Sequence, residues 1–183
     1  EDLANTHQVP LVYLTKKISN PEYKQILIDL KPDILVVIGW YYMVPRSLRS
    51  VAPLGAIGIH TSLLPKYRGG APLVWAMING ETQTGASLFY LEDGVDEGDI
   101  IGQDGFEIAF EDTIADIIQK ATETSTRLVS HYVPLLSVGK APRVSQDHNL
   151  ASIVPQRKPE DGLIDWHSRS VLQVYNWVRA QTH

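Results

Sequence analysis

The chain has 183 residues, of which 44% are hydrophobic and 20% are charged, as in a soluble globular protein. No apolar run approaches the roughly eighteen residues that a membrane span needs. There is no cysteine, which excludes disulfides, thiolate catalysis and cysteine-based zinc sites, and which leads us to expect a cytoplasmic protein. The formal net charge is −5 and no basic block is present, which argues against a nucleic-acid partner.

Strands and helices alternate in the first third of the chain. The clearest strand is the continuous aliphatic run at 34–38, which is typical of a strand buried on both faces. Asn20 and Pro21 form a helix start before 22–30. The expected order is a strand at 9–14, a helix at 22–30, a strand at 34–38, a helix at 45–51 and a strand at 56–60. This alternation with short links predicts an α/β fold with a parallel sheet.

The rest of the chain is predicted to add two strands and three helices. The expected order is a loop at 61–70, a helix at 71–79 ended by Gly80, a strand at 84–91, an acidic loop at 92–99, a strand at 100–110, a helix at 113–136 capped by Asp112, irregular chain at 144–159 and a helix at 171–180 capped by Ser168. The apolar spacing of the helix at 113–136 favours core packing.

Two side chains are expected at one edge of this sheet. Ligands of open parallel sheets bind outside the carboxyl ends of the strands. His60 ends one predicted strand, and Asp96 lies in the acidic loop after the next. A lone histidine at a strand end is more often structural than catalytic, so the spacing leaves both interpretations open. We predict that the two loops meet and that His60 faces Asp96.

The residues after His60 carry a long motif. Positions 60–72 read His-Thr-Ser-Leu-Leu-Pro-Lys-Tyr-Arg-Gly-Gly-Ala-Pro, which is longer than a strand-to-helix connection requires. Together with Trp75, Gly80-Glu81, Thr84-Gly85 and the Asp96-x-Gly98-x-Ile100 step, this motif resembles the folate-dependent formyltransferase family, and the resemblance covers essentially the whole chain.

The resemblance implies a fold and a reaction. The fold would be Rossmann-like, with a mostly parallel sheet and helices on both faces in three layers. The reaction would move a formyl group from 10-formyltetrahydrofolate to a primary amine, without a metal ion. His60 would donate to the tetrahedral oxyanion. Asp96 would hold the imidazole in place and act as the base or relay to it.

Further residues are expected around the folate and the amine acceptor. The two walls of the expected pterin pocket are Trp40, Tyr41, Tyr42 and Met43 on one side and Leu63, Leu64 and Pro65 on the other. Ordinary core and rim packing is the alternative for both walls. The residues expected at the acceptor are Tyr67, Arg68 and Gly69, with Arg68 placed either against an anionic part of the acceptor or against carboxylates of its own loop.

One position departs from the family pattern. The family has an asparagine two residues before the histidine, as a second oxyanion donor, and this chain has Gly58 there. Loss of one such donor typically costs about a hundred- to a thousandfold in rate. Ser62, Thr61 or a backbone N–H is expected to replace the donor. A slow enzyme, a different acceptor or a folate-binding relative without catalysis are the other interpretations.

Two segments of the sequence bear on the amine acceptor. Trp40-Tyr41-Tyr42 and the segment 157–167 look most like the sugar N-formyltransferases, in particular the enzyme domain acting on UDP-4-amino-4-deoxy-L-arabinose. The favoured acceptor is therefore the amine of a nucleotide-linked sugar. Methionyl-tRNA formyltransferase is the nearest alternative, and a formyltetrahydrofolate hydrolase or a non-catalytic folate-binding module are the others.

The resemblance also predicts how the chain divides. Residues 1–140 are expected to form the catalytic core, with the family's first strand and helix preceding Glu1. Residues 141–183 are expected to form a linker and the start of a C-terminal region.

Overall fold

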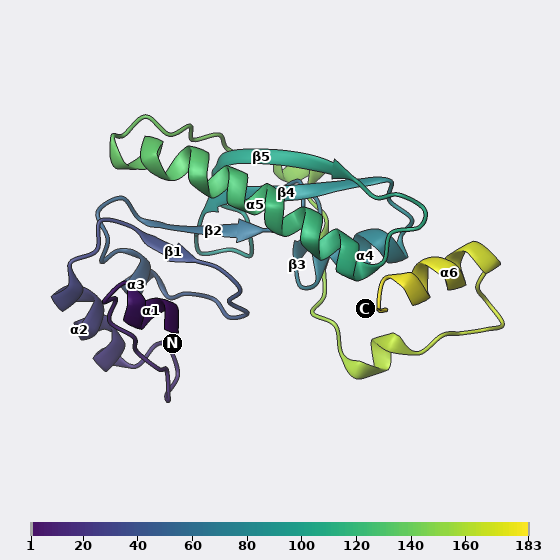
Figure 1. The fold of residues 1–183 in the computed structure, drawn as a ribbon, viewed down its shortest axis with the longest axis horizontal. Coiled ribbons are helices and arrows are strands. Elements are labelled where there is room, and N and C mark those ends of the chain that lie inside the picture. Colours follow the sequence, from purple (N-terminus) through teal and green to yellow (C-terminus); the bar gives the residue numbers. More distant parts are fainter. Residues whose placement is uncertain (1, 183) are drawn as a thin grey trace.

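The computed structural model describes residues 2–182, which fold around a four-stranded sheet (Figure 1). The strands lie in the order β1 (Leu35–Val37), β2 (Ala56–His60), β4 (Gln83–Tyr90) and β5 (Ile100–Glu107). A separate two-stranded parallel sheet joins β3 (Arg68–Gly69) to β6 (Ile153–Val154). The second sheet ties the loop after His60 to the C-terminal part of the chain.

The α/β class is confirmed, whereas the strand pairing is more mixed than expected. β1 and β2 are parallel, but β2 and β4 are antiparallel, and so are β4 and β5. The link between β4 and β5 contains no helix and is short, so the chain must turn back as a hairpin. The parallel part of the described sheet is therefore its N-terminal side.

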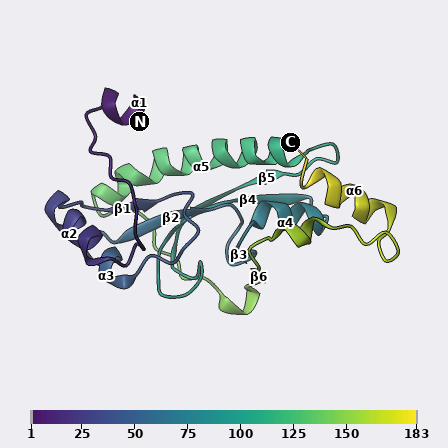
Figure 2. The same ribbon diagram turned by 90° about the horizontal axis from the view of Figure 1, so that it is seen from below.

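Helices cover both sides of the sheet. They are α1 (Asp2–Thr6), α2 (Pro21–Leu30), α3 (Arg46–Arg49), α4 (Pro72–Ile78), α5 (Ile114–Ser137) and α6 (Val171–Arg179), with 3-10 turns at His148–Leu150 and Pro159–Gly162. Figure 2 shows α5 along one face, with α3 and α4 on the opposite side, which gives the expected three layers. Among residues 2–182, no helix combines the length and the apolar character needed to cross a membrane.

The helix starts follow local hydrogen bonding, with two corrections. Asn20 caps α2 as predicted, and its side chain accepts from the Glu22 N–H. Thr113, and not Asp112, caps α5 in a capping box with Asp116. Ser170, and not Ser168, caps α6, because its hydroxyl accepts from the N–H three residues on.

The predicted strand at 9–14 is wrong. Residues 9–14 have no strand structure, and the side chains of Val9, Leu11 and Tyr13 are all more than half exposed. A strand needs a neighbour to pair its backbone groups, and neither of the two described sheets includes this segment. The apolar pattern therefore predicted a strand that does not join either described sheet.

Two apolar clusters hold the layers together, and α5 belongs to both. The first, which joins α4, α5 and α6, consists of Leu73, Ala76, Met77, Ile78, Ile108, Ile114, Ile117, Ala121, Trp177 and Ala180. The second, which joins the sheet to the C-terminal half of α5, consists of Ile57, Ala86, Leu88, Ile101, Leu128 and Leu136. Since α6 packs into the first cluster, the segment after residue 140 is attached to the core.

Arginines from two sides hold the loop between β4 and β5. Arg49 is buried on α3 and donates to the Leu91 carbonyl and to Asp93. Arg143 donates to Asp99 at 2.7 Å, and the Ser145 hydroxyl donates to the same carboxylate at 2.9 Å. This loop, which contains Asp96, is thereby fixed to α3 on one side and to the segment after α5 on the other.

Two adjacent isoleucines test the packing of α5. Ile117 is fully buried, whereas Ile118 is 44% exposed. We expect Ile117→Ala to lower the free energy of unfolding by about 3 kcal/mol, because it leaves a cavity in the apolar cluster that joins α4, α5 and α6. Ile118→Ala should cost less than about 1 kcal/mol. Urea denaturation of both variants measures the difference, and equal losses would contradict this description of the core.

Asp99 makes stability depend on pH. Its hydrogen bonds from Arg143, and then from Ser145, lower the pKa of Asp99. The carboxylate is thus more acidic in the folded protein, so its contribution is present above the unfolded value of about 4 and is lost as the pH falls through the lowered value. We expect Asp99→Asn to destabilise the protein by under about 1 kcal/mol at neutral pH, since this carboxylate is partly exposed.

Denaturation of wild type and Asp99→Asn at a series of pH values checks this expectation. The difference between the two proteins should shrink below about pH 4. A difference that stays constant down to about pH 2 would show that the two hydrogen bonds do not favour the ionised form.

Candidate active site

His60 lies at the carboxyl end of β2, and its side chain is 9% exposed. Its Nε2 lies 2.7 Å from the backbone oxygen of Tyr67, and its Nδ1 lies 3.5 Å from Asp96 Oδ2. A carbonyl oxygen only accepts, so Nε2 carries a hydrogen whenever the contact with Tyr67 is made. The other ring nitrogen, Nδ1, faces Asp96.

Asp96 is held in an unusual backbone conformation. Its φ is +50°, in the left-handed region that few non-glycine residues adopt. Its Oδ2 accepts from the Gly69 N–H at 2.8 Å, while the same oxygen faces His60. The structure therefore brings together the two loops that the sequence placed at one edge of the sheet.

A cavity of about 960 Å³ opens beside this pair. Its lining includes Gly58, His60, Gly69 and Asp96. Trp40, Tyr41, Tyr42 and Met43 form one wall, as expected, and the Trp40 and Tyr42 rings meet edge to face at 5.8 Å. The tyrosines are largely exposed, so this wall is an open aromatic surface and not part of the core.

The other expected pterin wall lies elsewhere. Leu63, Leu64 and Pro65 do not line the cavity. Leu64 is buried, and Leu63 packs against Gly85 of β4. The loop folds back over β4, which turns these apolar side chains inward. In their place, a face of α5 borders the cavity, with Ile118, Ala121, Thr122, Ser125, Thr126, Val129 and Ser130.

Ser62 is also turned away from the cavity. It is 1% exposed, and its hydroxyl donates to the Lys66 carbonyl at 2.6 Å. The Ser87 hydroxyl donates to the Ser62 carbonyl and accepts from the Leu64 N–H, so the loop is bonded to β4 from within. Of the two hydroxyls considered as replacement donors, Thr61 is the one that lines the cavity.

Gly58 lies on the same face of β2 as His60, two residues away. Both residues line the cavity. A Cβ at Gly58 would lie 3.0 Å from a methyl of Leu91 and 3.4 Å from the Phe89 ring. The space for a longer side chain therefore depends on a small shift of the flexible Leu91 side chain.

The structure separates the three residues expected at the acceptor. Gly69 lines the cavity, but Tyr67 and Arg68 do not. The Tyr67 hydroxyl donates to Glu81 at 2.7 Å, and burial, supported by this bond, raises the pKa of Tyr67. Arg68 is 4% exposed and donates to Gln146 Oε1 through Nε and Nη2, at 3.1 and 2.6 Å. Both side chains brace the loop.

The sequence reasoning missed two contributors to the site. One is the face of α5, where hydroxyl side chains recur at Thr122, Ser125, Thr126 and Ser130 beside the apolar core stripe. The spacing of these hydroxyl residues is a sequence pattern from which a polar, cavity-facing side of the helix could have been predicted. The other is the pair Gln146 and Gln156, in a segment expected to be a linker. A single glutamine in an irregular segment has no spacing that marks it.

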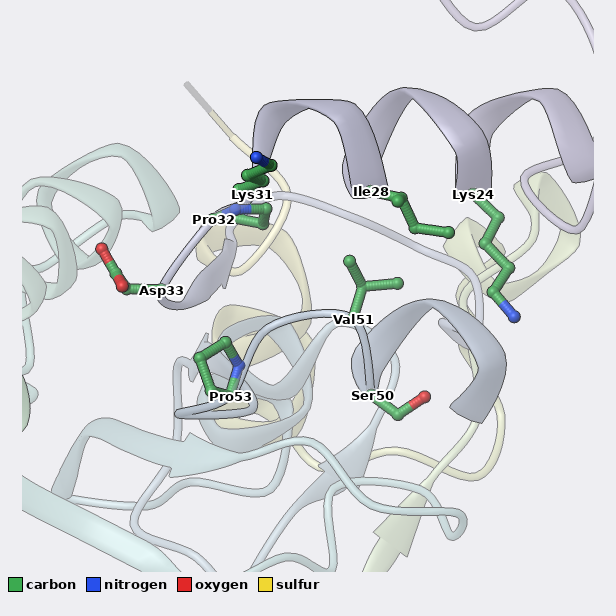
Figure 3. Close-up of a pocket in the computed structure, with 8 residues that line it drawn as sticks. All are labelled: Lys24, Ile28, Lys31, Pro32, Asp33, Ser50, Val51 and Pro53. Carbon is green, nitrogen blue, oxygen red and sulfur yellow. The ribbon is translucent and has the colours of Figure 1, made fainter.

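A second hollow of about 460 Å³ lies between α2 and the end of α3. Figure 3 shows the Ile28 and Val51 side chains facing each other across it, with Lys24 and Lys31 nearby. None of the predicted site residues lines this hollow. Within the described chain, no group of three histidine or carboxylate side chains is placed to hold a metal ion.

The chain resembles known proteins in sequence. Residues 4–133 match the formyl transferase family model. A methionyl-tRNA formyltransferase of Syntrophus aciditrophicus is 36% identical over 177 residues, which is 97% of this chain and 56% of the relative. The enzyme of the same name from Geobacter sulfurreducens is 36% identical over 180 residues, again 56% of its length. The chain thus spans a little over half the length of these relatives.

Solved structures share the fold. A 4-N formyltransferase from Francisella tularensis has a TM-score of 0.78 at 22% identity, covering 89% of this chain and 66% of its own. HypX from Aquifex aeolicus, in complex with tetrahydrofolic acid, has a TM-score of 0.75 at 22% identity, covering 88% and 28%. The family match over 4–133, the identity to the relatives and the shared Rossmann-like fold show that this chain belongs to the formyl transferase family.

Proposed function

We propose that the site at His60 and Asp96 transfers a formyl group from 10-formyltetrahydrofolate to a primary amine. The observation that carries the proposal is the contact between His60 Nδ1 and Asp96 Oδ2, at 3.5 Å beside a large cavity, in a chain of the formyl transferase family. Because the chain spans 56% of its relatives, the activity is proposed for the whole protein.

The reaction needs three things from the protein. The amine nitrogen forms a bond to the formyl carbon, and the carbonyl electrons move onto oxygen. Collapse of this adduct breaks the bond from the carbon to N10 of the folate, and the proton lost by the amine ends on N10. The site must therefore stabilise an oxyanion, accept a proton and return it.

His60 and Asp96 suit these tasks. Since His60 Nε2 is engaged by Tyr67, the hydrogen that His60 offers to the oxyanion is the one on Nδ1. Asp96 lies beside that nitrogen, where its carboxylate accepts the proton of the amine. The Gly69 N–H on Asp96 keeps the carboxylate in place during the transfer.

The cavity suits a folate in size and character. Its volume of about 960 Å³ is at the upper end of small-molecule sites. The exposed aromatic wall of Trp40, Tyr41 and Tyr42 offers flat apolar surface for a pterin. On α5, the hydroxyls of Thr122, Ser125 and Thr126 donate to backbone carbonyls of the helix, which leaves their oxygens to accept hydrogen bonds from a ligand.

The acceptor is proposed to be the amino group of methionyl-tRNA. Relatives named methionyl-tRNA formyltransferase are 36% identical to this chain, whereas the 4-N formyltransferase from Francisella tularensis shares its fold at 22% identity. The nucleotide-sugar amine is the second candidate. It is supported by the 157–167 segment and by the net charge of −5 without a basic block.

A spectroscopic assay of tetrahydrofolate release on the full-length protein tests the proposal. It is run without acceptor, with methionyl-tRNA and with UDP- or dTDP-linked 4-amino sugars. We expect turnover that depends on an amine, and on methionyl-tRNA first. Release without any amine would favour a hydrolase, and folate binding without turnover would favour a non-catalytic relative.

Two substitutions link the activity to the site. His60→Ala and Asp96→Asn should each lower kcat by about a thousandfold or more while leaving the fold intact, because each removes a group that acts in the transition state. Circular dichroism and thermal unfolding serve as the folding control. Rates like those of the wild type in either variant would remove this mechanism.

Gly58 yields a gain-of-function prediction. An asparagine there stands on the same face of β2 as His60 and supplies a second oxyanion donor. We expect Gly58→Asn to have a kcat about ten- to a hundredfold above that of Gly58→Ala, which adds the same Cβ without a donor. Equal rates in the two variants would show that another group already fills this role.

A further inference from the structure

We propose that Gln146 is a positioning residue that holds the Asp96 carboxylate beside Nδ1 of His60. The inference rests on the proposed function for its kinetic consequence and on the contacts of Gln146 for its structural basis. Gln146 belongs to the segment after α5, outside the matched range 4–133. The active site of this chain thereby includes a residue that the family match does not reach.

The Gln146 side chain uses its full bonding capacity. It is 6% exposed. Its Nε2 donates to the Asp96 carbonyl at 2.9 Å and to the Gly98 carbonyl at 2.7 Å. Its Oε1 accepts from Nε and Nη2 of Arg68. A carboxamide has two donor hydrogens and two acceptor sites, and all four are taken here.

The two donated bonds fall on the strained turn. Asp96 has a left-handed backbone, which persists only where neighbours fix it. Gln146 fixes the carbonyls at Asp96 and Gly98, while the Gly69 N–H fixes the Asp96 carboxylate. The backbone and the side chain of Asp96 are thus held by separate groups, and both are needed to aim the carboxylate at His60.

Arg68 links Gln146 to Gly69, the two residues that hold Asp96. It adjoins Gly69, and its guanidinium is bonded to Gln146 and to Nδ1 of His148. The amide of Gln146 therefore joins the loop of His60 to the loop of Asp96. Because the amide is satisfied on both sides, a shift of either loop breaks a buried hydrogen bond.

The segment of Gln146 is itself anchored. Val144 and Ile100 exchange both backbone hydrogen bonds, at 2.8 and 2.9 Å, and Arg143 bonds to Asp99. Gln146 is thus presented to the turn from a rigid edge next to β5. This placement distinguishes it from a glutamine that fills space in a mobile tail.

Gln146→Glu separates positioning from folding. The new carboxylate still accepts from Arg68, but it cannot donate to the Asp96 and Gly98 carbonyls. We expect kcat to fall about ten- to a hundredfold, since a small misplacement of a reacting group has effects of this size. KM for 10-formyltetrahydrofolate should stay within about threefold, because Gln146 does not line the cavity. Gln83→Glu, at an exposed position at the start of β4, makes the same change away from the site.

The ¹⁵N resonance of His60 Nδ1 gives a readout independent of turnover. In full-length labelled protein, Gln146→Glu should move this resonance in the same direction as Asp96→Asn, and Gln83→Glu should leave it unchanged. Gln146→Asn, which keeps the amide but is one methylene shorter, should give a smaller shift and serves if Gln146→Glu fails to fold.

The outcomes separate this inference from the proposed function. An Nδ1 resonance like that of the wild type in both folded Gln146 variants would overturn the positioning role, whatever the kinetics. A loss of kcat matched by an equal loss in Gln83→Glu would also overturn it. If the wild-type protein turns over no acceptor, the proposed function fails, and the resonance alone decides whether Gln146 positions Asp96.

Discussion

The hydrogen bond from the Gly69 N–H to the Asp96 carboxylate joins the two loops on which the site depends. It requires φ near +98° at Gly69 and +50° at Asp96. A Cβ at Gly69 would lie 2.2 Å from the Val154 carbonyl, so only glycine fits where β3 pairs with β6. The position of Asp96 relative to His60 therefore follows from a backbone contact between strands that are far apart in the sequence, and not from either loop alone.

The loop that contains Asp96 also carries several other carboxylates. The loop between β4 and β5 is rich in carboxylates, and Arg49 and Arg143 hold Glu92, Asp93 and Asp99. Within residues 2–182, the contact of the Asp96 carboxylate with a basic side chain is the one with His60. Because Glu92, Asp93 and Asp99 are paired with arginines, Asp96 is left to interact with the imidazole and with the Gly69 N–H. In the proposed reaction, this arrangement leaves the carboxylate available to accept the proton of the amine.

Much of this could be predicted from local pattern. The strand at 56–60, the helix over 113–136 and the meeting of His60 with Asp96 follow from apolar runs and from the geometry of strand ends. The orientation of Ser62 and Leu63 could not be predicted, because it depends on packing against β4. The strand expected at 9–14 failed for the related reason that pairing needs a neighbour. The role of Gln146 could not be predicted, because it depends on contacts with Arg68 and Gly98. These residues are remote in the sequence, and no periodicity indicates the contacts.

The glycine at position 58 makes the positioning of Asp96 more consequential in the proposed reaction. With no side-chain donor from Gly58, β2 offers the oxyanion only the ring of His60. His60 must then carry a larger share of the stabilisation than in a site where β2 supplies two side-chain donors, and the strength of its hydrogen bond depends on direction and distance. That direction is set by the Tyr67 carbonyl on one ring nitrogen and by Asp96 on the other. The hydrogen bonds from Gln146 and Gly69 that hold Asp96 are therefore expected to have a larger effect on kcat here than in a site with two donors. Gly58→Asn should accordingly reduce the loss of kcat that Gln146→Glu causes.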